Sequence, residues 1–482
     1  MLCRYPGPRV RGDASAAAVV VLAAAVVAAF LPVSDNGFVQ LDDDKNFLKN
    51  PFFRGLSREQ VAWAWTTRLV GVYQPLGWMV LEAQYSAWGL DPRGYHLASL
   101  ALHALITVAL YALTVALIAR CRPDLERDDP LAVRAGSCLA VGLFAVHPIR
   151  VEAVAWASCQ TYLPCALFSI LAVLAYLRAH VAPPRVSPGW LAGAWLLSAA
   201  ALLSKAVAVT LPVVLLILDM YPLRRLGPGR WLGPAARRVY GEKVPFAILS
   251  AVFIGLAVWA RSQSVVVVPG YTAATRGAMA CYGVWFYLVK TAVPVGLTPS
   301  YPIPLRVALT EPRFLASALG ILAATAGLVV MRRPLPGVLA AWAVYLVMLA
   351  PSTGLIPKGG PFIAADRYCF VPMMGLVVLA GGALAGVLRV GRFPPALASS
   401  VLIGGLVAGV ALGARTRAQC RTWRDSVALW SHALAVSTEP NPLAYHGLGL
   451  VRAGEPGGLT EAERLIGEEV RLTPDDPTAP TP

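Results

Sequence analysis

Charged residues are scarce in this chain. Only 14% of its 482 residues are Asp, Glu, Lys or Arg, whereas 57% are hydrophobic and the mean hydropathy is +0.62. A soluble globular domain carries about a quarter charged residues, so a soluble enzyme is excluded. Intrinsic disorder is excluded as well, because apolar runs such as 16–31 and 97–118 are long enough to be buried in the hydrocarbon core of a bilayer. The composition therefore predicts an all-α polytopic membrane protein.

The chain also lacks any C-x-x-C pair. Its eight cysteines are scattered from Cys3 to Cys420, which favours neither a zinc site nor a disulfide framework. We expect free thiols, with a disulfide between Cys159 and Cys165 as the minor alternative. No basic stripe with interleaved aromatic residues accompanies the net charge of +15. This charge therefore indicates membrane topology and contact with membrane lipids rather than binding of nucleic acid.

The apolar segments predict about eleven transmembrane helices, since a span needs about 20 residues. They are 14–33, 96–119, 135–149, 161–178, 188–204, 206–221, 244–261, 312–331, 335–351, 369–388 and 394–413. Two of them, 135–149 and 206–221, are short, which indicates a thinned bilayer or a recessed polar cavity beside them. A further segment, 277–293, has aromatic residues between Arg276 and Lys290 and is predicted to be an interfacial or re-entrant helix.

Basic residues in the short loops predict the orientation, because such loops tend to stay inside. They precede the first span and recur in every second loop up to Lys243, so the N-terminus is placed inside and the loop 34–94 outside. The first segment also has the basic start of a signal peptide, but its length favours a retained anchor. The arginines between 415 and 424 fall on the predicted outer side, against the rule.

Ionisable residues gather on the predicted outer face, in the loop 34–94 and at several span ends. Because such groups cost free energy against lipid, we expect them to line a shared cavity; the alternative for each is a solvated loop position. The candidates are Asp42, Asp43, Asp44, Glu82, His147, Arg150, Glu152, Lys205, Asp366 and Arg367.

The three consecutive aspartates, Asp42 to Asp44, are the most suggestive of these. Adjacent carboxylates raise one another's pKa, which suits a general base that works near neutral pH. Their oxygens would also suit a divalent metal such as Mg²⁺ or Mn²⁺. An acidic run that is simply hydrated is the plainer alternative, so both a base and a metal ligand stay open at this stage.

Two cations interrupt apolar sequence on the same face. Lys205 offers a point charge for a phosphate, or it snorkels to lipid headgroups. Arg367 offers a planar fork for phosphate oxygens, or it pairs with Asp366. His147 precedes Pro148, which is expected to end a helix, and it suits either a structural or an acid–base role.

From about residue 418 the composition becomes polar, so residues 1–417 are predicted to form the membrane domain and 418–482 a tail. The step from Pro440 to Pro474 is 34 residues, the period of a tetratricopeptide repeat. A single repeat cannot bury its own faces, so we expect 427–434 to add a helix or the tail to dock on the membrane domain.

Six stretches carry a family resemblance. They are FVQLDDDKNFLKNPFFRGLS, YQPLGWMVLEAQYSAWGLDPRGYHLASLALHAL, LFAVHPIRVEAVAWAS, LLSKAVAVTLPVVLLILDMYPLRR, GLIPKGGPFIAADRYCFVPMMGL and LWSHAL. In this order they resemble the transmembrane and tetratricopeptide-repeat protein O-mannosyltransferase-like family, including its bacterial members. The resemblance covers about residues 14–475 and implies a fold of the C-type glycosyltransferase superfamily, here with the repeat array reduced to about one unit.

The resemblance also implies a chemistry. Such enzymes take a sugar from a polyprenyl-phosphate donor and transfer it with inversion, and the acidic pair of their first outer loop maps to Asp42 and Asp43. One of these aspartates is then expected to deprotonate a Ser/Thr hydroxyl of an acceptor protein. From their placement and charge, Lys205 and Arg367 are expected to stabilise the leaving phosphate. The sugar that the family suggests is mannose.

Other functions stay open from the sequence alone. The acceptor could be a glycan or a lipid, and the chain could be a transporter or flippase of lipid-linked sugars or a membrane scaffold. The abundance of arginine, alanine and glycine is typical of a GC-rich bacterial genome. We therefore expect a bacterial inner membrane with the site facing the periplasm, or an endoplasmic reticulum membrane with the site in the lumen.

Overall fold

The computed structural model describes residues 12–181, 186–262, 272–304, 307–308, 310–355 and 362–472, with side chains from residue 14. Helices make up most of these residues, and the only strands among them are β1 (Tyr301–Pro302) and β2 (Phe362–Ala364), which pair antiparallel. The predicted all-α class is therefore confirmed.

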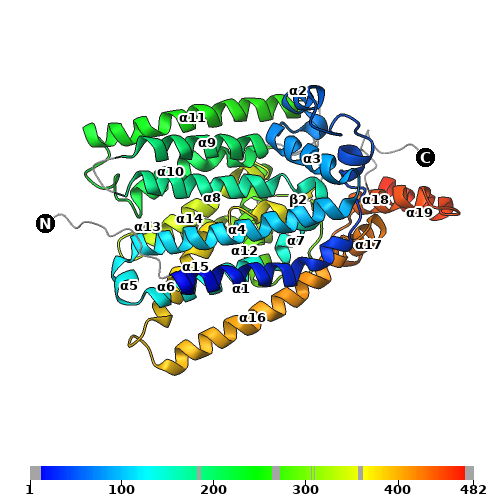
Figure 1. Ribbon diagram of the computed structural model, residues 1–482. Helices are drawn as coiled ribbons and strands as arrows, with labels where there is room; N and C mark the ends of the chain where they lie inside the picture. The colour runs from blue at the N-terminus through cyan, green and yellow to red at the C-terminus, as the bar shows by residue number, and fades with distance from the viewer. Residues whose placement is uncertain are drawn as a thin grey trace.

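Eleven apolar helices form the bundle, and most of them run roughly side by side in Figure 1. They are α1 (Gly12–Phe30), α4 (Pro92–Cys121), α6 (Pro130–Ala145), α8 (Tyr162–Ala179), α9 (Pro188–Ser204), α10 (Leu211–Met220), α11 (Pro234–Arg261), α13 (Pro312–Val330), α14 (Pro336–Leu349), α15 (Met374–Leu388) and α16 (Pro395–Arg421). Each of them overlaps one of the eleven apolar segments predicted above.

The number of spans is not confirmed as eleven. In the described residues, six helical segments are long and apolar enough to cross a membrane, or seven if the bent pair Pro130–Ala145 and Pro148–Ala155 is one span. The other apolar helices that the structure describes are shorter than a span, and two of them, α9 and α10, flank the break at Lys205. The chain is a multi-pass membrane protein, with several helices that end within the bundle.

Shorter elements complete the chain. The helices are α2 (Arg58–Thr66), α3 (Pro75–Trp88), α5 (Pro123–Asp128), α7 (Val151–Ala155), α12 (Ala273–Ala292), α17 (Ser426–Val436), α18 (Pro442–Ala453) and α19 (Leu459–Leu472). The single turns are η1 (Leu31–Asp35), η2 (Asp44–Leu48), η3 (Leu69–Gly71), η4 (Pro148–Arg150), η5 (Ala157–Cys159), η6 (Ala206–Thr210), η7 (Ala350–Ser352) and η8 (Asp366–Cys369).

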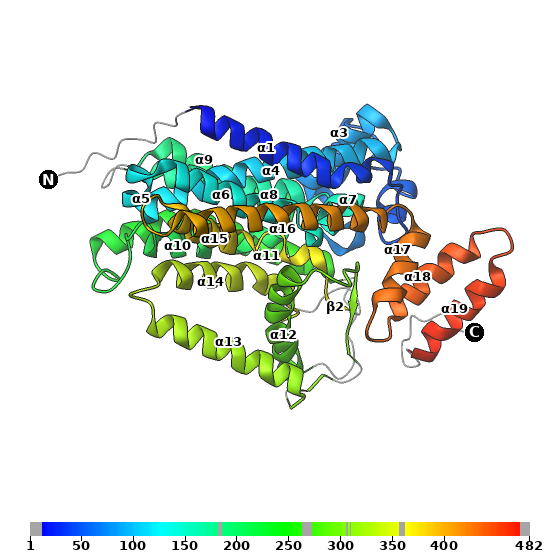
Figure 2. The same cartoon turned by 90° about the horizontal axis from the view of Figure 1, so that it is seen from below.

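Helix α12 corresponds to the segment predicted to be interfacial or re-entrant. Figure 2 shows it running across the direction of α13 and α14 instead of alongside them. It is also absent from the candidate spans in the described part of the chain. Its course agrees with leaving this segment out of the span count.

Local sequence explains where the helices stop. Proline at the first position begins α4 and α6, whose cap residues Asp91 and Asp129 accept hydrogen bonds from the first turn. Pro148 follows the end of α6, and the chain bends there by 59° before α7. Lys205 separates α9 from η6 in an extended conformation. These two breaks place polar residues inside the bundle.

Small residues allow the bundle helices to approach closely. A Cβ atom at Gly136 of α6 would lie 2.4 Å from the backbone nitrogen of Ala385 on α15, so any larger residue there would force the helices apart. Around such contacts lies one continuous core that includes Phe30, Tyr176 and Tyr345, all fully buried. This packing holds the broken helices in place.

Helices α2, α3 and α17–α19 gather at one end of the bundle, which we call the site end (Figure 1). The helices α17, α18 and α19 pack around Trp430, and a Cβ at Gly447 of α18 would lie 2.2 Å from that ring. Glycine at 447 is therefore needed for this close approach. The segment 427–434, predicted to add a helix, lies within α17, and α17 also contacts the membrane domain.

Candidate active site

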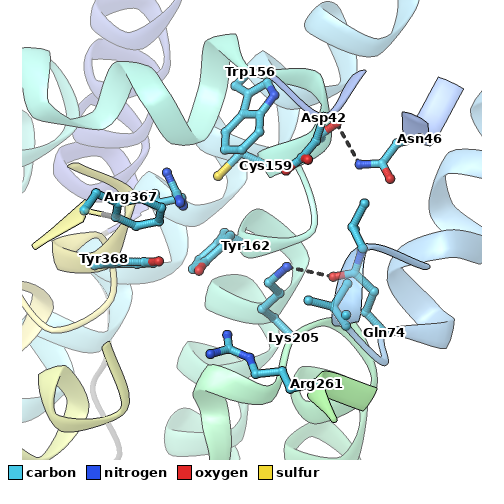
Figure 3. Close-up of a pocket in the computed structure, with 15 residues that line it drawn as sticks. Asp42, Asn46, Gln74, Trp156, Cys159, Tyr162, Lys205, Arg261, Arg367 and Tyr368 are labelled. Carbon is cyan, nitrogen blue, oxygen red and sulfur yellow. Dashed lines mark hydrogen bonds between the residues drawn. The ribbon is translucent and has the colours of Figure 1, made fainter. Parts of the chain in front are cut away.

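A cavity of about 150 Å³ opens at the site end, where breaks in several helices meet (Figure 3). Its walls come from the loop after α1, the approach to α3, the start of α8, the break before η6, the end of α11 and the segment around η8. The lining residues are Asp42, Asn46, Val70, Gly71, Val72, Gln74, Trp156, Ser158, Cys159, Tyr162, Lys205, Arg261, Phe362, Arg367 and Tyr368.

Three of the four residues predicted to do the chemistry line this cavity. Asp42, Lys205 and Arg367 reach it from parts of the chain that are far apart in sequence. Figure 3 shows them around the same space, together with the aromatic rings of Trp156, Tyr162 and Tyr368. The cavity thus combines one carboxylate with cations and flat apolar walls.

The three consecutive aspartates have different surroundings. Asp42 lines the cavity, and within the described residues its carboxylate forms no ion pair. Asp43 is fully buried, and its carboxylate accepts hydrogen bonds from Val39 N at 3.0 Å, Ser158 N at 2.9 Å and Ser158 Oγ. Asp44 is half-buried, lies outside the cavity lining and pairs with the exposed Lys49 at 3.2 Å. Only Asp42 is therefore placed to meet a molecule in the cavity.

Burial changes the acidity of the first two aspartates. It raises the pKa of Asp42 above its usual range, against the opposing effect of Lys45, Arg367 and Lys205. Burial also raises the pKa of Asp43 to about 7, against the hydrogen bonds from Ser158 and Val39. A carboxylate with a raised pKa is a stronger base, which suits Asp42 to proton abstraction.

Lys205 is held by a neutral partner. Its Nζ donates to Oε1 of Gln74 at 2.8 Å and lies 5.0 Å from the centre of the Tyr162 ring. Gln74 is itself buried, and its Oε1 also accepts a hydrogen bond from Thr161 at 3.3 Å. Because an amide carries no net charge, this anchor fixes the ammonium group without neutralising it.

Arg367 is held by a charged partner. Its guanidinium forms an ion pair with Glu152, and its backbone N–H donates to the second carboxylate oxygen of Glu152 at 2.6 Å. The ring of Trp156 lies 5.1 Å from the guanidinium carbon and that of Tyr368 lies 4.8 Å from it. The alternative of a pair with Asp366 is wrong, since Arg367 pairs with Glu152 and the Asp366 carboxylate accepts instead from the Tyr301 hydroxyl at 2.8 Å.

The remaining predicted residues lie outside the cavity lining. His147 contacts the carbonyl of Thr291 at 2.9 Å and accepts from the Ile149 backbone, so it caps the bend after α6. Arg150 is buried, donates to the Cys369 carbonyl at 3.1 Å and covers the Phe144 ring. Both side chains therefore contact other parts of the protein and do not reach the cavity.

Glu82, on α3, is also outside the lining. Its side chain is fully buried, and neither carboxylate oxygen has a hydrogen-bond partner in the described structure. Burial raises the pKa of Glu82 to about 7.

Gln74 and Arg261 are two cavity residues that the sequence analysis missed. Arg261 ends α11, the seventh predicted span, and its position at the outer end of that span was the signal that could have pointed to it. Gln74 lies in the YQPLGW stretch, but a neutral amide gives no charge signal. Its importance is visible only from its contact with Lys205.

The sequence allows Asp42 to Asp44 to bind a divalent metal ion. Among the described residues, no group of three or more His, Cys, Asp or Glu side chains is arranged to hold a metal ion. The neighbours of Asp42 do not supply such a set, because Asp43 is occupied by three donors and Asp44 by Lys49. Cys159 and Cys165 are free thiols, as are the other five cysteines that the structure describes.

Comparison with known proteins supports the resemblance that the sequence motifs indicated. The chain is 30% identical over 157 residues to mouse protein O-mannosyl-transferase TMTC2, 34% over 153 residues to Tmtc1 of Drosophila melanogaster and 36% over 109 residues to human TMTC4. These matches cover 32%, 30% and 22% of this chain but only 17%, 16% and 15% of the relatives' length.

No protein-family model matches the chain. Among solved structures, it is similar to ArnT from Cupriavidus metallidurans, described as bound to undecaprenyl phosphate. That likeness has a TM-score of 0.42 and 19% identity, and covers 94% of this chain and 76% of that one.

Proposed function

Because the chain is related to the protein O-mannosyl-transferases over about a third of its length, we propose that it is an integral-membrane glycosyltransferase. It moves a sugar from a polyprenyl-phosphate donor to Ser/Thr hydroxyls of proteins, with inversion. The observation that carries the proposal is that Asp42, Lys205 and Arg367 line one cavity at the site end. The relatives are protein O-mannosyl-transferases, which supports mannose as the sugar and a protein as the acceptor.

In this reaction Asp42 is the general base. Its carboxylate takes the proton of the acceptor hydroxyl, whose oxygen forms a bond to the anomeric carbon. The bond from that carbon to the donor's phosphate oxygen breaks on the opposite side, and its electrons leave with the polyprenyl phosphate. Asp43 is assigned to holding the loop, because its oxygens already accept three hydrogen bonds.

Lys205 and Arg367 have different roles in stabilising the leaving phosphate. Lys205 has a neutral anchor in Gln74, so no buried carboxylate balances its ammonium group, which is available to stabilise the negative charge that grows on the leaving phosphate. Arg367 is balanced by Glu152 and contributes directed N–H groups and a stacked wall more than net charge. This division follows from the charge of each anchor.

The first prediction tests this division at Gln74. A Gln74→Glu variant places a carboxylate against Lys205, which neutralises the ammonium group and repels the donor phosphate. We expect the KM for the lipid donor to rise about tenfold, which corresponds to about 1.4 kcal/mol. Steady-state kinetics with varied donor concentration measure this effect.

The matched control is Gln74→Met, which removes the acceptor atom without adding charge and is expected to change donor KM less. Thermal unfolding of both variants checks that the fold is kept. Equal donor KM in Gln74→Glu and the wild type would show that Lys205 does not meet the phosphate.

A second prediction concerns pH. The exposed Lys45 lowers the pKa of Asp42, so removing its charge in Lys45→Met raises that pKa further. More of the base is then protonated at a given acidic pH, and the acidic limb of kcat/KM moves to higher pH while the plateau stays unchanged. Initial rates measured from about pH 5 to about pH 9 give the apparent pKa of the acidic limb of kcat/KM for each protein.

The control for this variant is Arg58→Met, which removes an exposed cation of the same loop that is not among the groups that act on Asp42. Its acidic limb should match the wild type. Identical limbs in Lys45→Met and the wild type would mean that Asp42 is not the base whose titration limits the rate.

The proposed function itself is tested by transfer of radiolabelled sugar from polyprenyl-phosphate donors in membranes that contain the wild-type protein. We place the site end on the periplasmic side of a bacterial inner membrane, so donor and acceptor are supplied to that face. We expect label in protein, released by mild alkali as an O-linked sugar. Label in lipid or glycan would show that the acceptor is not a protein. Transfer no greater than in membranes that lack this protein would overturn the proposal in favour of lipid-linked sugar translocation.

A further inference from the structure

The segment that leads into Asp42 is held by the C-terminal helices. This segment, residues 36–41, lies between η1 and the aspartates, and four hydrogen bonds tie it to the chain between residues 420 and 430. They are Asn36 Nδ2 to Cys420 O at 3.1 Å, Gly37 N to Arg424 O at 2.8 Å, Gln40 N to Ser426 Oγ at 2.8 Å and Trp430 Nε1 to Gln40 O at 3.1 Å.

Apolar packing adds to these bonds. Leu41, directly before Asp42, packs against both the core of the membrane bundle and the core of the α17–α18 helices. Trp423, at the junction of α16 and α17, is buried and stacks on Trp156 at 5.9 Å between ring centres. Trp156 is itself a wall of the cavity.

The opposite side of the same segment is held by Asp43, which accepts from Val39 N and from Ser158. Asp42 therefore lies between two fixed points, one in the membrane domain and one in α17. The contacts with α17 therefore add to those that the membrane domain makes with the same segment, which include the burial of Val39 in the core of the bundle.

From this geometry we infer that α17 is a brace for the catalytic loop, and that Ser426 and Trp430 are positioning residues for Asp42. The inference rests on the proposed function, since it takes Asp42 as the base. It gives the C-terminal helices a part in positioning the base that does not depend on how an acceptor is recruited. A displacement of a base by about 1 Å can cost a hundredfold in rate.

The test uses the full-length protein with Ser426→Ala, which removes the acceptor of the Gln40 N–H, and Trp430→Phe, which removes the donor to the Gln40 carbonyl. Ser426→Thr keeps the hydroxyl and serves as the rescuing variant. Glu439→Gln is the matched control, because Glu439 joins the tail to Arg313 of α13 at 2.9 Å and does not contact residues 36–41.

Two readouts decide the matter. Hydrogen–deuterium exchange of the peptide that covers residues 36–47 needs no turnover, and we expect faster exchange in Ser426→Ala and Trp430→Phe than in the wild type, Ser426→Thr and Glu439→Gln. In transfer assays we expect kcat to fall about tenfold with the donor KM unchanged, equally for a short Ser/Thr peptide and for a protein acceptor.

Unchanged exchange in both variants would overturn the brace. Faster exchange with normal kcat would show that the contact has no catalytic role, and a loss confined to protein acceptors would make the helices an acceptor-binding element instead. If the wild type transfers no sugar, the proposed function fails on its own, while the exchange measurement still decides whether α17 fixes this loop.

Discussion

We expect transfer activity to fall about 10³-fold in the Asp42→Asn variant, because the amide keeps the size of the side chain but cannot take a proton from the acceptor hydroxyl. General bases contribute about 10² to 10⁴ in rate, and a base in a partly buried site lies within that range. The loss should be found in kcat, with the donor KM close to that of the wild type, since Asp42 acts on the acceptor. Radiolabel transfer in membranes with equal amounts of inserted protein measures it.

The neighbouring aspartates supply the controls for this prediction. Asp44→Asn should transfer at nearly the wild-type rate, because it loses only an exposed pair with Lys49, and such pairs contribute less than about 1 kcal/mol. Asp43→Asn disturbs three hydrogen bonds and should lower both stability and activity. A folded Asp42→Asn variant with wild-type kcat would move the role of base to another residue.

The second large effect is expected at Lys205. In Lys205→Met the growing charge on the leaving phosphate loses its uncompensated cation, and kcat falls about 10²-fold, the usual cost of removing one group that stabilises such charge. The fold should be kept, because Gln74 is neutral and still accepts a hydrogen bond from Thr161. Single-turnover rates at saturating donor isolate the chemical step.

Lys205 is a cleaner target than Arg367 for this purpose. Removing Arg367 would leave the buried carboxylate of Glu152 unpaired, which costs about 3–5 kcal/mol of folding stability. A loss of activity in that variant could then come from unfolding and not from the missing cation. The matched control is Lys49→Met, which removes an exposed lysine of the same end of the protein. If Lys205→Met and Lys49→Met transfer at the same rate, the phosphate is held elsewhere.

Hydropathy was sufficient to locate the helices, because burial in a bilayer demands long apolar segments whatever their neighbours are. All eleven predicted segments overlap helices of the bundle. It was not sufficient to count the spans, since proline and charged residues break several of these helices within the bundle. The break at Lys205 is an example: the two flanking segments were predicted as separate spans, yet both are shorter than a span.

The residue types of the site were also predictable, because ionisable groups in apolar surroundings need a common polar space. Asp42, Lys205 and Arg367 were selected on that ground and line one cavity. The same argument selected Glu82, His147, Arg150 and Asp366, which do not line it. Position near a span end predicts burial of a polar group but not the direction in which its side chain points.

The sequence by itself therefore determined the class of the protein, the position of its helices and the chemical character of its site, because these depend on local composition and on the bilayer. Only the tertiary structure decided which aspartate faces the cavity, and that Gln74 anchors Lys205 across 131 residues and Glu152 anchors Arg367 across 215. It also placed α17 against the loop before Asp42. Such pairings depend on packing between distant segments, and one residue type is compatible with many partners until the chain has folded.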